Sequence, residues 1–344
     1  MPITAKELAQ KLNLSPAAIS MALNNKPGVS IATKKLVLET ADKYGYDFSR
    51  LAKKHNIKGN ICFIMYKKHG AIVGDTYFFS ELVSGITLGC KQFDYKINIY
   101  YIDESNGEII GQLEEVRNSD CSGIIVLGTE MAPLDLKPFL KLPVPLVLLD
   151  TYFNTISCDS VLINNVQGAY LATSHLIKKI KKQPGYLHSS YTIANFSERS
   201  NGFYNAVRAH GMSASNSIVH LLSPSLDGAY ADMKVLLKNG EKLAECYFAD
   251  NDLIAIGAMK ALKEYGYKIP HDIAIVGFDN IPTCKVIEPN LSTIHVPKTY
   301  MGVMAVSRLV SLMNDPKASP IKLEIGTSLI ERLSSDISPV SKKG

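Results

Sequence analysis

The sequence predicts a small all-α helix-turn-helix headpiece, followed by a larger two-lobed α/β body built on doubly wound parallel sheets. Three short stretches with helical spacing of apolar residues, each preceded by a capping residue, lie in the first 48 residues. From residue 60 onward, apolar strand-like runs alternate with helical stretches, which is typical of parallel sheets covered by helices. In a chain of 344 residues this body is too long for one such sheet, so two lobes are expected.

The first two predicted helices have clear start and stop signals. Thr4 and Glu7 have the spacing of a capping box, and Asn13 can adopt the left-handed conformation that ends a helix. Ser15 can cap the second helix, with Pro16 at its first position, where a missing N–H costs nothing. Apolar residues at helical spacing predict the buried faces, namely Leu8, Ala9 and Leu12 in the first helix and Ile19, Ala22 and Leu23 in the second.

A third helix is predicted to begin after Ser30 and to end at Gly45. We expect four of its residues to face inward: Leu36, Val37, Thr40 and Ala41. Two short helices joined by a tight turn and braced by a third form the helix-turn-helix arrangement, in which the second helix enters the major groove of DNA.

Excess positive charge is confined to the start of the chain. Residues 1–59 hold ten Lys or Arg against four Asp or Glu, whereas the remainder holds 27 against 28. This distribution favours a polyanion-binding module attached to a nearly neutral body. A basic, solvated face without a partner is the alternative interpretation.

The body is predicted to contain at least eight strands and six helices. The expected strands are 61–66, 97–102, 123–127, 146–149, 185–188, 218–222, 246–249 and 273–277. The expected helices are 79–93, 107–118, 168–181, 197–210, 229–238 and 253–265. In such sheets a ligand binds at the carboxyl ends of the strands, here in the cleft between the lobes.

Several classes of protein are disfavoured by the sequence. It has no apolar run long enough to span a membrane and no apolar leader, so we expect a cytoplasmic protein without a membrane partner. The six cysteines are scattered and read as reduced, structural thiols. None of the common catalytic or nucleotide-binding motifs occurs, and the eight histidines are dispersed, so we expect no enzyme activity, no cofactor and no metal. A buried histidine such as His188 is expected to be a satisfied core residue.

The stretch ITAKELAQKLNLSPAAISMALNN at 3–25 resembles the opening of LacI/GalR-family repressors, and PGVSIATKKLVLETADKYGYDFSRLAKK at 27–54 is similar to the family's third helix and hinge. Further segments resemble the family's sensor domain in the family's order. They are YFFSELVSGI at 77–86, PLVLLD at 145–150, INNVQGAYLATSHLI at 163–177, ERSNGF at 198–203, FADNDLIAIGAMKAL at 248–262, IPHDIAIVGFDN at 269–280, EPNLSTIHVP at 288–297 and LIERLSS at 329–335, the last being close to the usual C-terminal strand.

This resemblance implies a periplasmic-binding-protein-like core and a division of the chain. Residues 1–48 would be the DNA-binding domain, 49–59 the hinge, and 60–344 the effector-binding and dimerisation core. Within the core, the N-lobe would comprise about 60–164 and 296–326, and the C-lobe about 165–295 and 327–344. The chain would therefore cross between the lobes near Asn164, His295 and Gly326.

The resemblance also assigns roles in DNA binding. The residues placed on base edges and the DNA backbone are Thr4, Ser15, Pro16, Ala17, Ser20, Met21, Asn24, Ser30, Thr33 and Tyr46, together with Leu51, Lys53, Lys54 and His55 in the hinge. Met21 replaces an Arg common in the family, so base reading should rely on apolar contact. His55 replaces the Leu that wedges into the minor groove, and Phe48 replaces a Pro. We therefore expect weaker DNA bending, unless Leu51 serves as the wedge.

The family's ligand-contacting positions fall on Phe78, Asp150, Arg199, Asn251 and Asp279, whose chemistry suits a polyol. Arg199 would span two ligand oxygens bidentately. Each residue also has a structural alternative: core packing for Phe78, helix capping for Asp150 and Asn251, a surface ion pair for Arg199, and a turn for Asp279. The sequence departs from the family at Asn164, where Asp is frequent, and near Pro224, where the only nearby aromatic is Tyr230. An unusual pocket wall is expected from Tyr186, Tyr191 and Phe196.

The resemblance implies a sequence-specific transcriptional regulator, a repressor of carbohydrate-utilisation genes that binds a palindromic operator as a homodimer and responds to a sugar or sugar derivative. Two alternatives stay open. One is a sugar-binding receptor without DNA binding, and the other is a regulator of this kind that senses a nucleobase-like or aryl-glycoside ligand. A sugar-processing enzyme is opposed by the absence of catalytic motifs.

Overall fold

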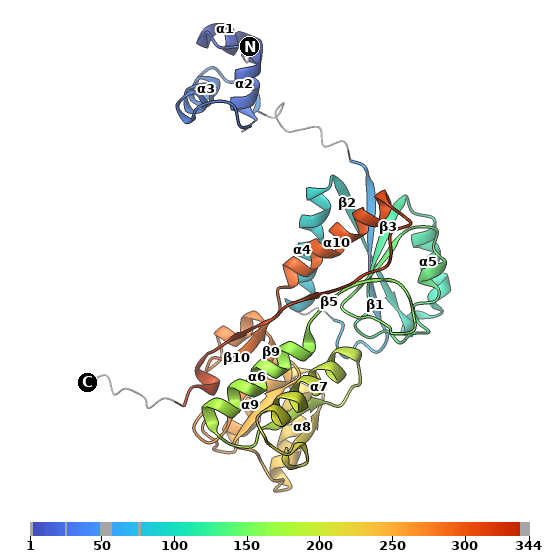
Figure 1. The fold of residues 1–344 in the computed structure, drawn as a ribbon, viewed down its shortest axis with the longest axis vertical. Helices are drawn as coiled ribbons and strands as arrows, with labels where there is room; N and C mark the ends of the chain where they lie inside the picture. Colours follow the sequence, from blue (N-terminus) through green and yellow to red (C-terminus); the bar gives the residue numbers. More distant parts are fainter. Residues whose placement is uncertain (1–2, 25, 49–56, 75–76, 338–344) are drawn as a thin grey trace, which may run out of the picture. The chain divides into compact units, whose positions relative to one another are not determined.

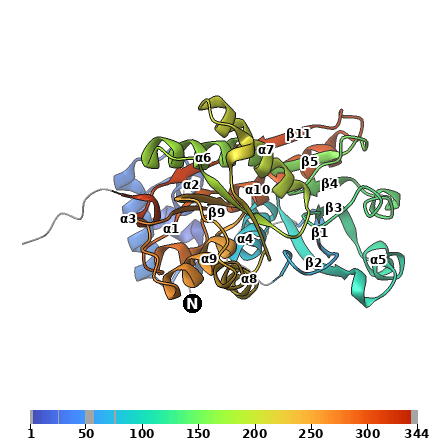
Figure 2. The same cartoon turned by 90° about the horizontal axis from the view of Figure 1, so that it is seen from below.

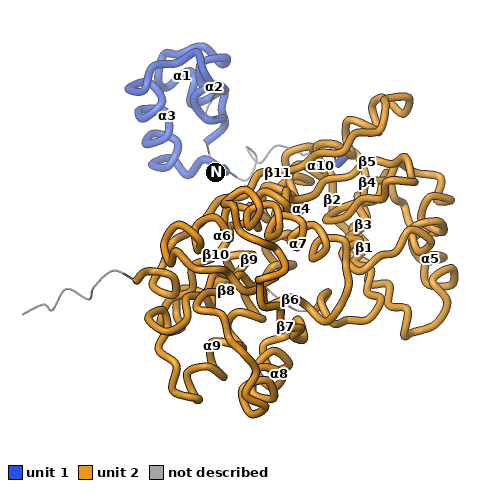
Figure 3. The backbone as a smooth tube through the Cα atoms, turned by 60° about the horizontal axis from the view of Figure 1, so that its bottom comes forward, with its two compact units in different colours: residues 1–57 blue, residues 58–344 orange. Residues whose placement is uncertain are grey.

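The computed structural model describes residues 3–24, 26–48, 57–74 and 77–337 (Figure 1). The chain divides into two compact units, residues 1–57 and residues 58–344 (Figure 3). Each unit has its own apolar core. No helix among the described ranges combines the length and the apolar character needed to cross a membrane.

The first unit contains three helices, α1 (Ala5–Leu12), α2 (Pro16–Leu23) and α3 (Ile31–Lys43). Their ends are those predicted from the sequence. The Thr4–Glu7 capping box is formed on both sides, with the Thr4 amide donating to the Glu7 carboxylate over 2.7 Å. Asn13 is left-handed with φ 52°, and the Ser15 hydroxyl accepts from the amide of Ala18 at 3.1 Å. Local side-chain chemistry therefore determines the helix boundaries here.

The core of this unit is built around Leu8, Ile19, Val37 and Ala41. The predicted inward face of α3 was wrong in two places, because Leu36 is 50% exposed and Thr40 is only part-buried. Val37 and Ala41 lie one helical turn apart on the buried face, whereas Leu36 is rotated by about 100° away from Val37. Thr40 satisfies its hydroxyl within the helix by donating to the Leu36 carbonyl at 2.7 Å.

The second unit contains two six-stranded sheets. The first has the order β11-β5-β4-β3-β1-β2 and defines the N-lobe, and the second has the order β12-β10-β9-β8-β6-β7 and defines the C-lobe. The strands of the N-lobe are β1 (Gly59–Lys67), β2 (Tyr95–Asp103), β3 (Cys121–Leu127), β4 (Leu146–Leu149), β5 (Asp159–Ile163) and β11 (Lys322–Ile325). Those of the C-lobe are β6 (Gly185–Ser189), β7 (Val219–Leu222), β8 (Cys246–Ala249), β9 (Ala274–Asp279), β10 (Ser292–His295) and β12 (Ser328–Ile330). Among the described strands, every pairing is parallel except that of β10 with β12.

Helices cover both faces of each sheet, as expected for doubly wound sheets. The helices are α4 (Tyr77–Gln92), α5 (Ile109–Arg117), α6 (Asn165–Ile180), α7 (Ala194–Ala209), α8 (Leu226–Lys238), α9 (Asp252–Glu264) and α10 (Lys298–Asn314). In the C-lobe, α6 and α7 lie on one side of the sheet and α8 and α9 on the other (Figure 2). Alternate residues of one strand enter different cores, as Phe63 and Ile64 of β1 do.

The chain passes between the two sheets three times. It leaves the first sheet after β5 to enter α6, returns from β10 into α10, and runs from β11 directly into β12. Asn164 stands at the first passage and caps α6, with its side-chain oxygen accepting from the amide of Gln167 at 2.9 Å. Three separate segments therefore join the lobes.

Several elements were not among those predicted. They are β5, β10, β11 and the 17-residue helix α10. Of the stretch predicted as a C-terminal strand at 329–335, only the first two residues belong to β12, and 333–335 form a turn of 3₁₀ helix. In α10, Gly302 lowers helix propensity in the sequence, but the structure requires it, because a Cβ there would overlap the backbone of Ile86 in α4. Short strands and a helix with an interior glycine give weak signals in the sequence, and only the elements packed against them in the structure make them evident.

Candidate functional site

A cavity of about 330 Å³ lies in the second unit, at the carboxyl ends of strands from both sheets. Asp150 directly follows β4, Asp279 is the last residue of β9, and Asn251 follows β8 by two residues. The structure brings all five residues predicted to contact a ligand into the lining of this cavity: Phe78, Asp150, Arg199, Asn251 and Asp279. That they bind a ligand stays a prediction.

Asp150 is a buried carboxylate with one oxygen left open. Its backbone is left-handed with φ 64°, and the Thr129 hydroxyl donates to its Oδ2 at 2.7 Å. Its Oδ1 is buried and has no hydrogen-bond partner. Burial raises the pKa of Asp150 to about 6, although Thr129 and Arg199 act in the opposite direction. No helix follows Asp150, so the alternative of a helix cap does not apply to it.

Asp279 repeats this arrangement on the other side of the cavity. Its φ is 109°, and its Oδ1 is likewise buried without a hydrogen bond, 3.5 Å from Nη2 of Arg199. Burial raises its pKa, and Arg199 and Lys298 oppose that rise. Lys298 is buried and donates from Nζ to the Asp279 carbonyl at 2.7 Å. The turn formed at Asp279 therefore aims a carboxylate into the cavity.

Arg199 is held on all sides, which alters the role predicted for it. Nε donates to Asn165 Oδ1 at 2.9 Å, Nη1 donates to the Asp250 carbonyl, and Nη2 faces Asp279. The guanidinium carbon lies 3.8 Å from the ring centroid of Phe278 and 5.5 Å from that of Phe196. Because these partners already use its planar fork, Arg199 orients the surrounding polar groups and has little capacity left for a bidentate contact with a ligand.

Asn251 lines the cavity and is also the N-cap of α9, so its structural alternative is confirmed. Its Oδ1 accepts from the amide of Ile254 at 2.8 Å, and its Nδ2 donates to the Pro224 carbonyl at 3.3 Å. The next residue, Asp252, was not predicted and also lines the cavity. Burial raises its pKa to about 7, and it accepts from the Thr293 hydroxyl and the Ile281 amide at 2.5 and 2.9 Å.

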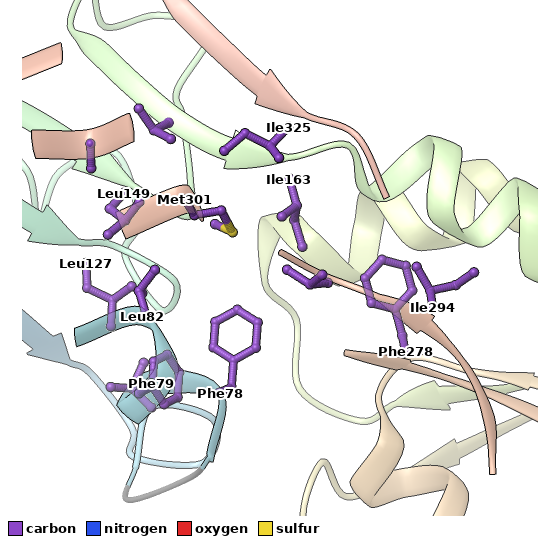
Figure 4. Close-up of a cluster of buried hydrophobic side chains, with 14 of the residues drawn as sticks. Phe78, Phe79, Leu82, Leu127, Leu149, Ile163, Phe278, Ile294, Met301 and Ile325 are labelled. Atoms are coloured by element: carbon purple, nitrogen blue, oxygen red, sulfur yellow. The ribbon is translucent and has the colours of Figure 1, made fainter. Parts of the chain in front are cut away.

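The remaining cavity wall is largely apolar. It includes Ile72, Phe78, Phe79, Ile193, Phe196, Leu253 and Ile281. Phe78 belongs to an apolar cluster shared by both lobes, with N-lobe side chains such as Leu149 on one side and Phe278 on the other (Figure 4). Phe78 therefore packs in the core and also lines the cavity.

The predicted aromatic wall was wrong for two of its three members. Phe196 lines the cavity, because α7 begins at Ala194, earlier than predicted, and places this ring in its first turn. Tyr186 is buried in the core between Phe203 and Phe248, and Tyr191 is 42% exposed beside His69. Tyr230 is also outside the lining, and its hydroxyl donates to Glu264 at 2.8 Å.

Asp250 is a buried carboxylate that sequence reasoning missed. Its oxygens accept from the Tyr186 hydroxyl, from His188 Nδ1 at 2.6 Å and from the Ser189 amide at 2.7 Å. Burial lowers the pKa of His188, but the hydrogen bond and charge of Asp250 outweigh this and raise it overall. His188 is thus a satisfied structural residue, as expected. The spacing Asp250-Asn251-Asp252 directly after a buried strand was the available signal.

In the first unit, most residues predicted to contact DNA lie at the surface. Exposed members are Thr4, Ser15, Pro16, Ala17, Ser20, Asn24 and Ser30, whereas Met21, Thr33 and Tyr46 are part-buried. A Cβ at Gly28 would lie 2.8 Å from the sulfur of Met21, so this side chain packs onto the following turn. The hinge residues Leu51, Lys53, Lys54 and His55 lie outside the described residues.

Metal-binding clusters of three or more His, Cys, Asp or Glu are absent from the part of the chain that the structure describes. All six cysteines are free. The cavity combines acidic and amide side chains with apolar walls. This combination suits a ligand that donates hydrogen bonds.

Comparison with known proteins extends this description to the whole chain. A model of the periplasmic binding protein-like domain matches residues 173–335. The HTH-type transcriptional repressor PurR of Actinobacillus pleuropneumoniae serotype 3 is 28% identical over 337 residues, covering 96% of this chain and 98% of the repressor. Similarity to this repressor thus includes the first unit as well as the cavity.

Two solved structures share the fold. The complex of the transcriptional regulator CelR with cellobiose has a TM-score of 0.72 at 21% identity, covering 96% of this chain and 99% of that one. The lac repressor dimer bound to operator and the anti-inducer ONPF has a TM-score of 0.68 at 20% identity, covering 97% of this chain and 99% of that one. At these identities the likeness shows the fold.

Proposed function

The chain belongs to the LacI/GalR family of transcriptional regulators, and from that premise we propose that it binds an operator in double-stranded DNA and regulates transcription in response to a small ligand. The observation that carries the proposal is the joining of two different units in one chain. A capped, basic three-helix unit precedes a body that encloses a cavity with two buried carboxylate oxygens that accept no hydrogen bond. A plain binding protein has no use for the first unit.

DNA binding is assigned to residues 1–48, with 49–59 as the hinge. The surface of α2 carries Pro16, Ala17, Ser20 and Asn24, all exposed, and its N-terminus can face phosphate. Met21, Pro16 and Ala17 carry no side-chain group that can donate a hydrogen bond, so few side chains on α2 can make bidentate hydrogen bonds to bases. Phosphate contacts and apolar contacts to thymine should therefore dominate recognition, and affinity should fall steeply with salt.

A gel-shift assay with DNA from upstream of the protein's own gene tests this assignment. The informative variant is Ala17→Glu, because Glu in the first turn of α2 favours the helix while placing negative charge towards phosphate. The same assay on Gln10→Glu, an exposed position of α1 outside the predicted contacts, is the matched control. We expect shifted DNA with wild type and Gln10→Glu only. Unaltered binding by Ala17→Glu would contradict the assignment.

The ligand is proposed to be neutral and rich in hydroxyl groups, a sugar or sugar derivative. Asp150 offers an open acceptor to the cavity, and Asp279 offers an oxygen that accepts no hydrogen bond but is ion-paired with Arg199. Arg199 itself is occupied by its neighbours. An anionic ligand would thus meet like charge without a free cation among the described lining residues. The apolar walls, with Phe78 and Phe196, can pack against a sugar ring face. These rings also favour the second candidate, a nucleobase-like or aryl-glycoside ligand, which they could stack against.

Thermal-shift and calorimetric titrations separate these ligand classes. The panel consists of D-ribose, D-galactose and cellobiose, the 5-phosphate of ribose and the 1-phosphate of galactose, adenine, and a nitrophenyl galactoside. Stabilisation by a neutral sugar and not by its phosphate supports the proposal. Tighter binding of adenine or the aryl glycoside would favour the alternative, and preference for a phosphate would overturn both.

The remaining assignments follow from this function. Residues 60–344 would bind the effector and form a homodimer, because one helix-turn-helix reads only a few base pairs and a twofold dimer matches a palindromic operator. A protein acting on DNA in this way would work in the cytoplasm and without catalysis. Light scattering at micromolar concentration tests the dimer, and a monomer or tetramer mass would contradict it.

A further inference from the structure

Glu130 occupies an unusual position beside the cavity. It follows β3 by three residues, and its carboxylate accepts hydrogen bonds from five backbone amides of the segment that follows β1. Oε2 accepts from residues 68, 69 and 70 at 2.8, 2.9 and 3.1 Å, and Oε1 accepts from residues 72 and 73 at 2.8 Å each. We refer to residues 68–74 as the β1 loop.

The carboxylate is well suited to this task. Glu130 is 4% exposed, and although its burial raises the pKa, the amides of the β1 loop lower it overall, so the group is held ionised. Converging backbone N–H groups form a cradle of the kind that proteins use to bind anions. Here the cradle is filled by a side chain of the same chain. Gly70, left-handed with φ 63°, allows the loop to curl around it.

The β1 loop and the residue next to Glu130 both line the cavity. Residues 70, 71, 72 and 74 line it, and so does Thr129, the neighbour of Glu130. Thr129 in turn donates to Asp150. Two consecutive residues therefore act on the cavity. Glu130 holds the β1 loop, which forms part of the cavity wall, and Thr129 orients the carboxylate of Asp150.

The C-lobe contains the corresponding arrangement. Asp250 follows β8, the third strand of its sheet as β3 is of the other, and it accepts from the Ser189 amide at the end of the first strand, β6. In both lobes, therefore, a carboxylate that follows the third strand accepts hydrogen bonds from backbone amides at or just after the end of the first strand. The N-lobe version differs in tying a whole loop that faces the cavity.

We propose that Glu130 is a positioning residue of the ligand site, which holds the β1 loop in the shape that closes the cavity wall. This inference rests on the proposed function, because it assumes that the cavity binds a ligand. The hydrogen bonds between Glu130 and the β1 loop do not depend on DNA binding. A second tie, between Lys68 Nζ and Asp135 at 2.7 Å, reaches only the start of the loop. Without Glu130, five amides lose a charged acceptor at once.

Hydrogen–deuterium exchange resolved to peptides tests the proposal on the full chain. In Glu130→Gln, which keeps the size of the side chain, we expect exchange in 68–73 to accelerate roughly tenfold or more, because an amide group cannot accept from all five donors. Peptides of the C-lobe should be unchanged. Glu108→Gln is the matched control, since Glu108 is exposed and makes no capping hydrogen bond.

A rescue experiment distinguishes anchoring by a carboxylate from a general packing effect. In Glu130→Ala, sodium formate should restore slow exchange in 68–73, whereas sodium chloride at the same concentration should not. Wild-type exchange rates in Glu130→Gln, or equal effects of formate and chloride, would overturn the proposal. If Glu130→Ala does not fold, the Glu130→Gln comparison decides alone. Gel shifts on the same samples test the proposed function separately. If the wild-type protein does not bind operator DNA, the proposed function fails, but the exchange rates still show whether Glu130 anchors the β1 loop.

Discussion

The two lobes of the body share one strand order and use corresponding positions differently. Numbered within each lobe, both sheets run 6-5-4-3-1-2. The carboxylates after the third strands, Glu130 and Asp250, are fully occupied by donors of their own lobe. Those at the fourth strands, Asp150 and Asp279, have positive φ and one buried oxygen each that accepts no hydrogen bond, and in Asp279 this oxygen is ion-paired with Arg199. The same scaffold thus offers each lobe one structural acid and one acid open to the cavity.

The comparison teaches that burial alone does not distinguish a structural acid from a binding acid. Asp150 and Asp250 are both almost fully buried. They differ in whether the surrounding chain satisfies both oxygens. An acid with an open oxygen carries a desolvation cost that a ligand can offset, whereas a satisfied acid contributes to stability only.

The largest effect should come from breaking the satisfied acid of the C-lobe. Asp250→Asn leaves the donors Tyr186, His188 and Ser189 competing for one oxygen, and it places an amide group among them. We expect a loss of about 2–4 kcal/mol in the free energy of unfolding. Urea unfolding followed by circular dichroism measures it. A loss no larger than that of the exposed control Asp227→Asn would contradict the structural role.

The helix after the first strand gives a second, sharper test of equivalence. Gly85 in α4 and Gly202 in α7 both approach a neighbouring helix so closely that a Cβ would overlap the carbonyl oxygen of Thr299 or Val166. Gly85→Ala and Gly202→Ala should each destabilise by about 1–3 kcal/mol, because backbone must move.

Gly111 provides the control for both. It lies in α5 with open space around its Cα, so Gly111→Ala should stabilise by about 0.5–1 kcal/mol through helix propensity. Thermal unfolding of the three variants gives the comparison. Equal melting temperatures for Gly85→Ala and Gly111→Ala would contradict the close contact between α4 and α10.

Replacing an open acid should separate stability from binding. Asp150→Asn keeps the left-handed backbone, which Asn tolerates, and removes the cost of burying a charge. At pH 7 the variant should gain on the order of 1–3 kcal/mol in unfolding free energy without ligand, because burial raises the pKa of Asp150 to about 6. Its response to a ligand found by titration should be lost. If Asp150→Asn is less stable than wild type, both carboxylate oxygens of Asp150 have hydrogen-bond donors, as those of Asp250 do.

The smallest effect is the pH dependence of that difference. Since the pKa of Asp150 is raised to about 6, the native state takes up a proton at a pH where the unfolded chain is still ionised. As pH falls from 7 through 6 towards 4, wild type should gain stability relative to Asp150→Asn, and the gap between them should close. Urea titrations at several pH values measure this gap. A gap that widens on acidification would mean that the pKa is lowered.

Local chemistry in the sequence was enough for the helix boundaries of the first unit and for many strands of the body. Capping residues such as Thr4, Ser15 and Ser30 act within one helical turn, so the ends of α1, α2 and α3 are readable from neighbours in the chain. Continuous apolar runs predicted strands such as β4 and β8 with their observed bounds. The residues after those strands, Asp150 and Asn251, were assigned to the site by the resemblance to the LacI/GalR family, and both line the cavity.

Only the tertiary structure decided which polar groups are occupied. Glu130 and its five donors are separated by about sixty residues in sequence, and Arg199 is held by groups from α6, β9 and the end of β8, so neither role has a local signature. The inward face of α3 and the positions of Tyr186 and Tyr191 depended in the same way on what packs against them. Periodicity reports which residues prefer burial, whereas satisfaction of a donor or acceptor depends on atoms that folding brings together from distant parts of the chain.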